Sequence, residues 1–170
     1  MTSLRRCFGA ASVSMFLLPI VVAAQDEPSK ELEQKACGPK EKEVKYVADT
    51  DKSRHLTPDQ PADKALVYVL RPSMMGNKVQ TRLAVDGDWK GVNRGNNYFY
   101  FTLDPGEHYF CSAAENHSVL TVKVEAGKTY YVQQHIRMGM MKARNEIETM
   151  DEGEGKTKLA DVHLSTWEVK

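Results

Sequence analysis

Five histidines in this sequence have imidazole nitrogens that could bind a metal: His55, His108, His117, His135 and His163. No two of them form an H-x-H, H-x3-H or HExxH unit, which are spacings that bring two ligands together locally. Spacing therefore gives no support to a zinc site, and no metal site is favoured on this ground. We interpret His108, which follows a Pro-Gly turn, as an exposed hairpin residue.

Two methionine clusters suggest a softer metal. Each cluster follows a predicted strand, and a histidine lies close to the second; the residues are Met74, Met75, His135, Met138, Met140 and Met141. Thioethers together with an imidazole suit Cu(I). The same methionines could instead form an adaptable apolar surface for a protein partner, or ordinary loops packed partly into the core. The sequence leaves these three interpretations open.

The first 24 residues have the pattern of a secretory signal peptide. Arg5 and Arg6 form a short basic region, residues 8–22 are almost wholly apolar or small, and small side chains end at Ala24. The apolar stretch is shorter than the roughly 20 residues of a spanning helix, and Pro19 interrupts it. We predict export with cleavage after Ala24, which gives a periplasmic or extracellular protein without stable membrane insertion.

Charge argues against two classes of partner. The whole chain has 23 basic and 23 acidic residues, and loss of the signal peptide removes two arginines, which leaves a formal charge of −2. No Lys/Arg stripe stands out in the remaining sequence. Nucleic acids and anionic membrane surfaces are therefore poor candidate partners.

Two cysteines remain after the predicted cleavage, Cys37 and Cys111. In an oxidising compartment an isolated pair of this kind usually forms one disulfide. The bridge would tie the N-terminal segment to the domain that follows, and closing so long a loop is worth roughly 4 kcal/mol of stability. The alternative is a buried free thiol that packs as a small hydrophobe.

Composition divides the mature chain in two. Residues 25–64 are dominated by Lys, Glu, Asp and Pro, and such a segment buries too little apolar area to offset its ordering entropy. We predict a polar, mostly irregular N-terminal arm, with a short helix over residues 29–36 that is capped by Ser29 and stops at Gly38. Residues 65–170 then form one β-sandwich domain.

Short β-branched and aromatic runs begin at Ala65 and are separated by Gly, Asn, Asp and Pro. Their period-two alternation predicts an all-β fold, an antiparallel β-sandwich of about seven strands. The candidate strands are residues 65–71, 80–87, 97–103, 107–115, 118–125 and 128–137, with weaker candidates at 144–150 and 164–170. The first is apolar on both faces, which is typical of a central strand.

Three short connections indicate tight reversals: Asp104-Pro105-Gly106, Asp86-Gly87 and residues 125–128. Proline fixes φ and glycine accepts a positive φ, as type I and type II turns require. We expect these turns to pair sequence neighbours as antiparallel hairpins. No room remains for the crossover helices of a parallel sheet, and no GxGxxG or GxxxxGKS/T pattern occurs, which disfavours nucleotide-binding architectures.

The alternation also predicts an outward aromatic face, formed by Tyr98 and Tyr100 and joined by Trp89 and Tyr131. Such a face could stack on sugars or peptides, or it could be a cross-strand ladder that stabilises the sheet. For catalysis we find no GxSxG motif, no free cysteine nucleophile if Cys111 is bridged, and no patterned pair of carboxylates. We therefore expect a protein without catalytic residues and without a cofactor.

Four segments occur in order between residues 64 and 137: KALVYVLRP, LAVDGDWKGV, NNYFYFTLDPGEHYFC and VKVEAGKTYYVQ. This order resembles the DUF2846 family of exported bacterial domains of unknown function. The turn motif of Asp104, Pro105, Gly106 and His108 is also similar to PEGA-type and carboxypeptidase-regulatory-like modules, which are small β-sandwiches. The resemblance implies a sandwich in the cell envelope or outside the cell, with no established activity.

Together these observations predict an exported, non-catalytic binding or structural module of the bacterial cell envelope. Its partner would be an unknown envelope protein or glycan, contacted through loops and the aromatic face. The alternative is a periplasmic copper-binding protein that uses the methionine loops and His135.

Overall fold

A computed structural model describes residues 29–39, 44–138 and 143–169. The predicted signal peptide, Met140 and Met141 lie outside these ranges. The elements within them are α1 (Lys30–Cys37), β1 (Tyr46–Asp51), β2 (Ala65–Arg71), β3 (Thr81–Val85), β4 (Asp88–Asn93), β5 (Asn97–Leu103), β6 (Gly106–Ala113), β7 (His117–Val124), β8 (Thr129–Met138), β9 (Ala143–Met150), α2 (Glu152–Ala160) and β10 (His163–Val169). Neither described helix has the length and apolar character needed to cross a membrane.

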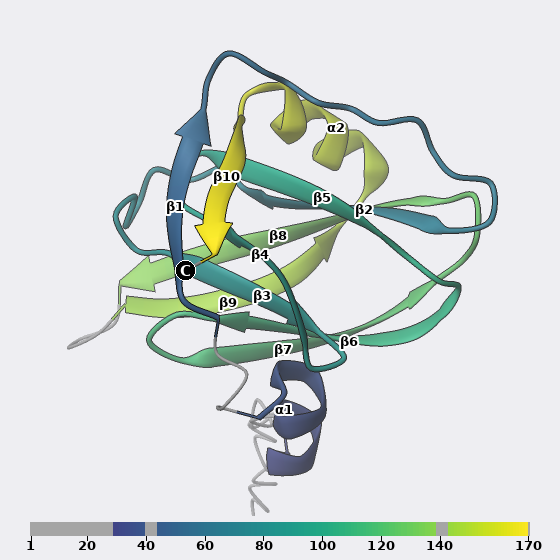
Figure 1. The fold of residues 1–170 in the computed structure, drawn as a ribbon, viewed down its shortest axis with the longest axis horizontal. Coiled ribbons are helices and arrows are strands. Elements are labelled where there is room, and N and C mark those ends of the chain that lie inside the picture. The colour runs from purple at the N-terminus through teal and green to yellow at the C-terminus, as the bar shows by residue number, and fades with distance from the viewer. Residues whose placement is uncertain (1–28, 40–43, 139–142, 170) are drawn as a thin grey trace, which may run out of the picture.

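The strands form two stacked sheets (Figure 1). One sheet has six strands in the order β1-β10-β5-β2-β8-β9, and the other has four in the order β4-β3-β6-β7. Six of the eight pairings between described strands are antiparallel, while β10–β5 and β2–β8 are parallel. The predicted all-β sandwich is confirmed, and it has ten described strands rather than about seven.

Two of the three predicted reversals connect the sheets instead of forming hairpins. The turn at Pro105 leads from β5 to β6, and residues 125–128 lead from β7 to β8, yet the strands of each pair lie in different sheets. The expectation of hairpins at these two places is wrong. Alternation specifies only which face of a strand is buried, and a turn that crosses to the opposite sheet preserves that pattern as well as a hairpin does.

The Asp86-Gly87 turn does form a hairpin. The angle φ is 53° at Asp86 and 82° at Gly87, the positive pair that a type I′ turn requires, and β3 pairs with β4 across it. The strands β6–β7 and β8–β9 form two further antiparallel pairs between chain neighbours. The parallel pairing of β8 with β2 arises because the chain passes through the other sheet before it returns.

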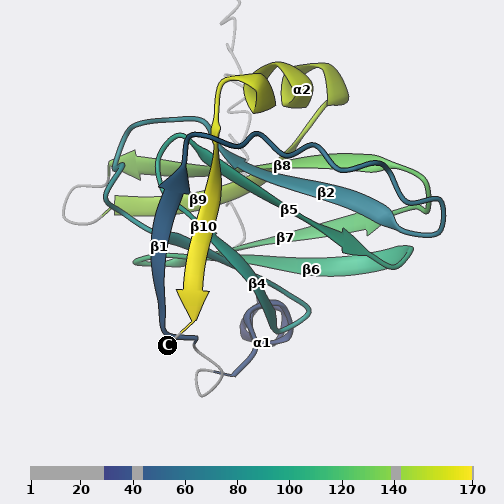
Figure 2. The ribbon, with the colours of Figure 1, turned by 45° about the horizontal axis from the view of Figure 1, so that its top comes forward.

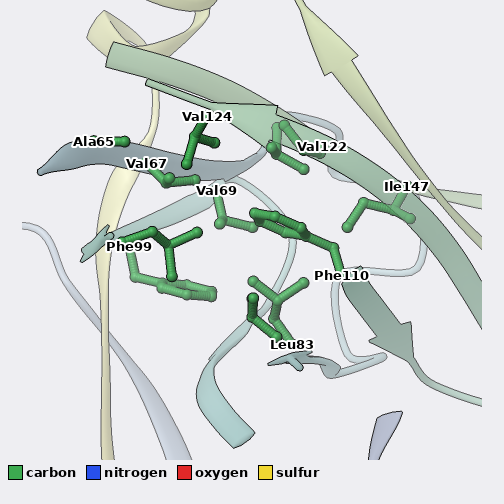
Figure 3. Packing of buried hydrophobic residues seen from close by; sticks show 12 residues of the cluster. Ala65, Val67, Val69, Leu83, Phe99, Phe110, Val122, Val124 and Ile147 are labelled. Atoms are coloured by element: carbon green, nitrogen blue, oxygen red, sulfur yellow. The ribbon is translucent and has the colours of Figure 1, made fainter. Parts of the chain in front are cut away.

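The main core fills the space between the sheets (Figure 3). Val67 and Val69 of β2 and Phe99 of β5 pack with Leu83 of β3 and Phe110 of β6, and all five residues are at most 2% exposed. Full burial of such a side chain is worth about 1.5 to 3 kcal/mol. This shared apolar layer holds the two sheets together.

A second apolar cluster covers the outer face of the six-stranded sheet. Leu66, Tyr68 and Leu70 of β2 meet Leu159 of α2 there, and Figure 2 shows α2 lying over β8 and β2. Every residue of β2 is consequently buried. β2 is therefore the central strand that its apolar sequence predicted.

A buried polar network links the two sheets. The Gln134 amide oxygen of β8 accepts hydrogen bonds from Thr81 Oγ1 at 3.0 Å and Asn93 Nδ2 at 3.1 Å, while its nitrogen donates to Ser112 Oγ at 2.8 Å. Ser112 Oγ donates in turn to Asn145 Oδ1 at 2.8 Å. All five residues are at most 1% exposed. A buried polar group without a partner costs about 1 to 3 kcal/mol, so this network favours one register between the sheets.

The arm contains more regular structure than its composition predicted. Helix α1 begins after its N-cap Ser29, where a helix was predicted. Strand β1 was not predicted, and it pairs with β10 at the edge of the six-stranded sheet. The boundary placed before Ala65 therefore separates strands of one sheet. Local composition could not indicate β1, because its pairing partner lies at the other end of the chain.

Gly155 permits α2 to dock on the sheet. A Cβ built on Gly155 would lie 2.2 Å from Tyr131 Cγ, whereas a Cβ on Gly153 of the same helix would meet Asp151 Oδ1 at 3.3 Å. We expect Gly155→Ala to lower the free energy of unfolding by about 1 to 3 kcal/mol through overpacking. The matched control Gly153→Ala should change it little or raise it by up to about 1 kcal/mol, since alanine favours the helix. Urea denaturation measures both values, and equal effects would contradict this docking.

Candidate functional site

Helix α1 packs on the outer face of the four-stranded sheet, on the side of the molecule opposite α2 (Figure 2). Ala36 is fully buried there against Cys111 and Ala113 of β6. The helix ends at Gly38, where φ is 74° and a Cβ would lie 2.5 Å from the carbonyl oxygen of Gly87. Gly87 N donates to Ala36 O at 3.0 Å. Two glycines thus allow the end of α1 to contact the β3–β4 turn.

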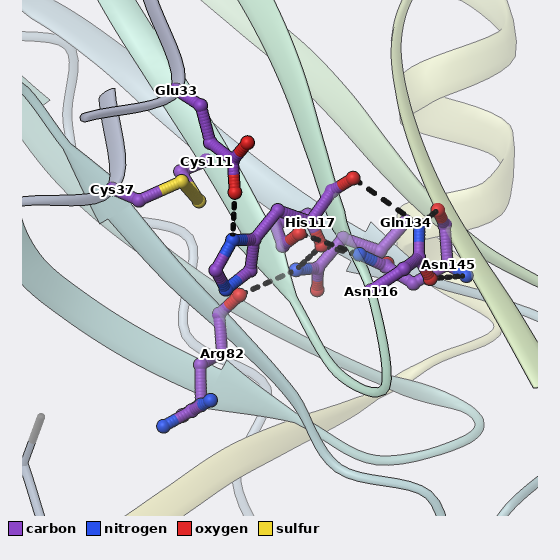
Figure 4. The surroundings of a disulfide bond; sticks show 9 residues. Glu33, Cys37, Arg82, Cys111, Asn116, His117, Gln134 and Asn145 are labelled. Atoms are coloured by element: carbon purple, nitrogen blue, oxygen red, sulfur yellow. Dashed lines mark hydrogen bonds and ion pairs between the residues drawn. A yellow bond between two sulfur atoms is a disulfide. The ribbon is translucent and has the colours of Figure 1, made fainter. Parts of the chain in front are cut away.

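A disulfide joins α1 to the sheet, as the sequence predicted. It links Cys37, the last residue of the helix, to Cys111 of β6, with Cα atoms 5.0 Å apart (Figure 4). β6 is an inner strand of its sheet, and Cys111 is 1% exposed. The bridge therefore fixes the C-terminal end of α1 to a well-supported part of the sandwich.

A cavity of about 360 Å³ lies beside the disulfide. The chain after α1 and the strands β3, β4 and β6 contribute to its walls; the lining includes Pro39, Val44, Arg82, Ala84, Trp89 and His117. Cavities that bind small ligands or side chains typically have volumes of roughly 300 to 1,000 Å³ and combine apolar walls with a few polar groups. This cavity fits that description at its smaller end.

Trp89 is the one residue of the predicted aromatic face that lines this cavity. Its ring stacks on Tyr46 of β1 with centroids 6.0 Å apart and meets Trp167 of β10 edge-on at 5.4 Å. The Nε1–H group is buried and has no hydrogen-bond acceptor among the described residues. A buried donor without an acceptor costs about 1 to 3 kcal/mol.

His117 borders the cavity next to the disulfide (Figure 4). Its Nδ1 is hydrogen-bonded to the Glu33 carboxylate of α1, and the two side chains are 35% and 38% exposed. One potential ligand atom each from Glu33, Cys37 and His117 lie within 4.8 Å of one another. Because Cys37 is bridged, its sulfur offers no thiolate to a metal in this state.

His108 has a structural role in the turn motif. Its side chain is only 15% exposed, which corrects the expectation of an exposed residue, and its Nδ1 lies 2.6 Å from Asp86 Oδ2. Its Nε2 lies 2.9 Å from the carbonyl oxygen of Asp104. Lys64 Nζ lies 2.5 Å from Asp104 Oδ1, and this hydrogen bond and ion pair lower the pKa of the Asp104 carboxyl. The motif thus joins two turns of the sandwich.

The predicted outward aromatic face is wrong. Tyr98 and Tyr131 are 0% and 5% exposed, Tyr100 is half-buried, and all three belong to the cluster beneath α2. Tyr68 stacks on Tyr131 with ring centroids 5.4 Å apart, and burial raises the pKa of Tyr68 to about 12. These tyrosines form the cross-strand ladder of the alternative interpretation, because a helix later in the chain covers the face that alternation placed outside.

The structure describes only some of the methionines in the two predicted clusters. Met74 and Met75 are 59% and 52% exposed, in the loop that follows β2. Because β2 and β8 pair in parallel, this loop and the end of β8 lie at the same end of the sheet. Met140 and Met141 lie outside the described residues. His135 Nε2 lies 2.6 Å from Glu148 Oε1.

A second hollow, of about 330 Å³, lies near the end of β1 and is more polar. Its lining includes Lys52, Asn77, Arg94, Asn97 and His163. No buried polar group without a partner lies among these residues. The cavity at the disulfide therefore remains the stronger candidate site.

Reasoning from the sequence missed Glu33 and Arg82, and it considered His117 only as one of five histidines without a ligand spacing. A partial signal exists for one of them, because Glu33 and Cys37 are four residues apart and so share one face of a helix. Nothing local connects them to His117, which lies 84 positions after Glu33. Only the docking of α1 brings these residues to one place.

Removing the bridge should release α1 while leaving β1 in place. In a Cys37→Ala/Cys111→Ala variant we expect the amides of α1 to lose hydrogen-exchange protection, because Ala36 is the one buried residue of that helix. The amides of β1 should stay protected, since β1 is hydrogen-bonded to β10. Hydrogen exchange read by mass spectrometry measures both segments. Unchanged protection of α1, or equal loss in both, would contradict this role of the bridge.

The comparisons with known proteins concern the central part of the chain. The family described as "Protein of unknown function (DUF2846)" matches residues 61–146, which is just over half of the chain. An uncharacterized protein of Haemophilus influenzae is 28% identical over 100 residues, which cover 58% of this chain and 60% of that relative. The chain thus spans about three fifths of the relative's length.

No solved structure matches the chain, and the likeness to PEGA-type modules gains no support. The family match covers β2 to β8, including Cys111, but it excludes Cys37. The resemblance seen in the four sequence segments is thereby confirmed: this chain belongs to the DUF2846 family.

Proposed function

We propose that this protein is an exported, non-catalytic binding module of the bacterial cell envelope, which holds an apolar side chain of a protein partner in the cavity beside the disulfide. The observation that carries the proposal is the cavity itself, which has the Trp89 side chain in its largely apolar lining.

Export is supported by the first 24 residues and by the disulfide. The basic, apolar and small-residue regions follow the order of a signal peptide. A structural disulfide persists in an oxidising compartment and is rare in the cytosol. The mature protein would then begin at Gln25 and function in the periplasm or outside the cell.

A binding role is favoured over catalysis by the surroundings of the histidines. The three histidine–carboxylate pairs of the described residues are His108–Asp86, His117–Glu33 and His135–Glu148. Within the part of the chain that the structure describes, no Ser or Thr hydroxyl is hydrogen-bonded to any of these histidines. Among the described residues, a hydroxyl nucleophile activated by one of these three histidines therefore has no candidate.

Site-directed photocrosslinking in the exporting cell tests the proposal. A benzophenone amino acid at Val44, which lines the cavity, should form one reproducible adduct with an envelope protein. The same group at Lys123, an exposed residue of β7 away from the cavity lining, should form none. Trp89→Ala should abolish the Val44 adduct, and Trp89→Phe, which keeps an aromatic ring in the cavity lining, should reduce it less.

Adducts of equal yield from Val44 and Lys123, or none from Val44 in correctly exported protein, would contradict a partner at the cavity. Correct export is checked by the N-terminus of the recovered protein, which should be Gln25.

A second candidate function is Cu(I) binding, which the parallel pairing of β2 and β8 favours because these two strands end at the same end of the sheet. Titration with Cu(I) against a competing chelator should show binding that weakens at least about tenfold, or roughly 1.4 kcal/mol, in Met74→Leu/Met75→Leu and in Met140→Leu/Met141→Leu. Absent binding, or binding unchanged in both variants, would exclude this function.

A further inference from the structure

We propose that reduction of the Cys37–Cys111 bridge turns the contact between α1 and the four-stranded sheet into a Zn²⁺ site. Its ligands would be the two thiolates, a ring nitrogen of His117 and the Glu33 carboxylate. The proposal is independent of any partner in the cavity. It rests on two pairs of side chains that two separate elements direct to one place.

The helix supplies the first pair. Glu33 and Cys37 are four residues apart in α1, so they lie one above the other on the same face of the helix. Ala36, between them in sequence, is fully buried against β6. The helix therefore presents a carboxylate and a sulfur to the sheet along the face by which it is docked.

The β6–β7 hairpin supplies the second pair. Cys111 is paired with Val119, and Ala113 is paired with His117. Residues directly opposite in an antiparallel pair share a face, and so do residues two apart in one strand. Cys111 and His117 are therefore diagonal neighbours on the face that α1 covers.

The two pairs already meet in the bridged protein. The carboxylate of Glu33 is hydrogen-bonded to His117 Nδ1, as Figure 4 shows. Ligand atoms of Glu33, Cys37 and His117 lie within 4.8 Å of one another, and Cys111 Sγ is bonded to Cys37 Sγ. Tetrahedral zinc binds two thiolates, an imidazole and a carboxylate at about 2.0 to 2.3 Å each, so small side-chain movements would close the set.

A dithiol can serve as the reductant of the Cys37–Cys111 bridge. The dithiol is oxidised to its own disulfide, while the Cys37–Cys111 bond takes up two electrons and two protons and becomes two thiols. Zn²⁺ then displaces both thiol protons to solvent as it binds the thiolates. In the bridged state neither sulfur has a thiolate to offer, so the redox state of the pair decides whether the metal binds.

Zinc and cobalt binding to the full mature chain tests this site. After reduction with a phosphine, which is oxidised to its oxide and competes little for metal, one equivalent of Zn²⁺ should bind. Co²⁺ in its place should give the charge-transfer absorption of a thiolate complex. The bridged protein should bind neither ion in this way.

Variants of two proposed ligands distinguish a folded four-ligand site from metal binding by the two reduced cysteines alone. His117→Ala and Glu33→Gln should each weaken Zn²⁺ binding at least about tenfold, a loss of roughly 1.4 kcal/mol. The controls Glu31→Gln, an exposed carboxylate on the same helix, and His55→Ala, an exposed histidine, should leave it unchanged. Hydrogen exchange should show that Zn²⁺ restores protection to α1 in the reduced protein.

Two results would overturn the proposal. One is a reduced wild-type protein that binds no stoichiometric Zn²⁺. The other is binding of equal strength in wild type, His117→Ala and Glu33→Gln, since metal held by the thiols of an unfolded arm would not depend on these two residues.

Discussion

The burial of β2 on both faces is the constraint on which the rest of this structure depends. A strand without a polar face must be covered twice, and here the four-stranded sheet covers one side while α2 covers the other. The segment before β2 also lies on the face that α2 covers. There the Tyr98 hydroxyl accepts a hydrogen bond from Leu56 N at 2.7 Å and donates one to Leu56 O at 3.0 Å. The sandwich therefore requires segments on both sides of the family match.

Much of this fold could be predicted from residue alternation, and its failures have one physical cause. Period-two patterns locate β2, β3 and β5 to β10, and the wholly apolar run at 65–71 marks the central strand. Alternation states which side chains share a face, but it does not say what covers that face. The tyrosines beneath α2 were predicted to be exposed for this reason. Strands β1 and β4 were missed because their sequences are half polar, so that pairing with neighbouring strands determines their conformation.

Of the candidate site, only the disulfide could be predicted from the sequence. Two cysteines in a chain with a predicted signal peptide indicate a bridge, but the cavity needs the end of α1, three strands and the chain after the helix to meet. Cys111 lies inside the family match and Cys37 lies before it. One wall of the cavity thus lies in the region that the family model matches, and the other is added by the arm, which explains why local motifs did not reveal the cavity.

Truncation of adjacent residues in β2 tests the two-sided burial most directly. Val69 packs in the core between the sheets, Leu70 packs in the cluster beneath α2, and both are fully buried. We expect Leu70→Ala to lower the free energy of unfolding by about 2 to 4 kcal/mol, a loss at least as large as that of Val69→Ala. A change within about 0.5 kcal/mol for Leu70→Ala, the range of surface substitutions, would contradict the account.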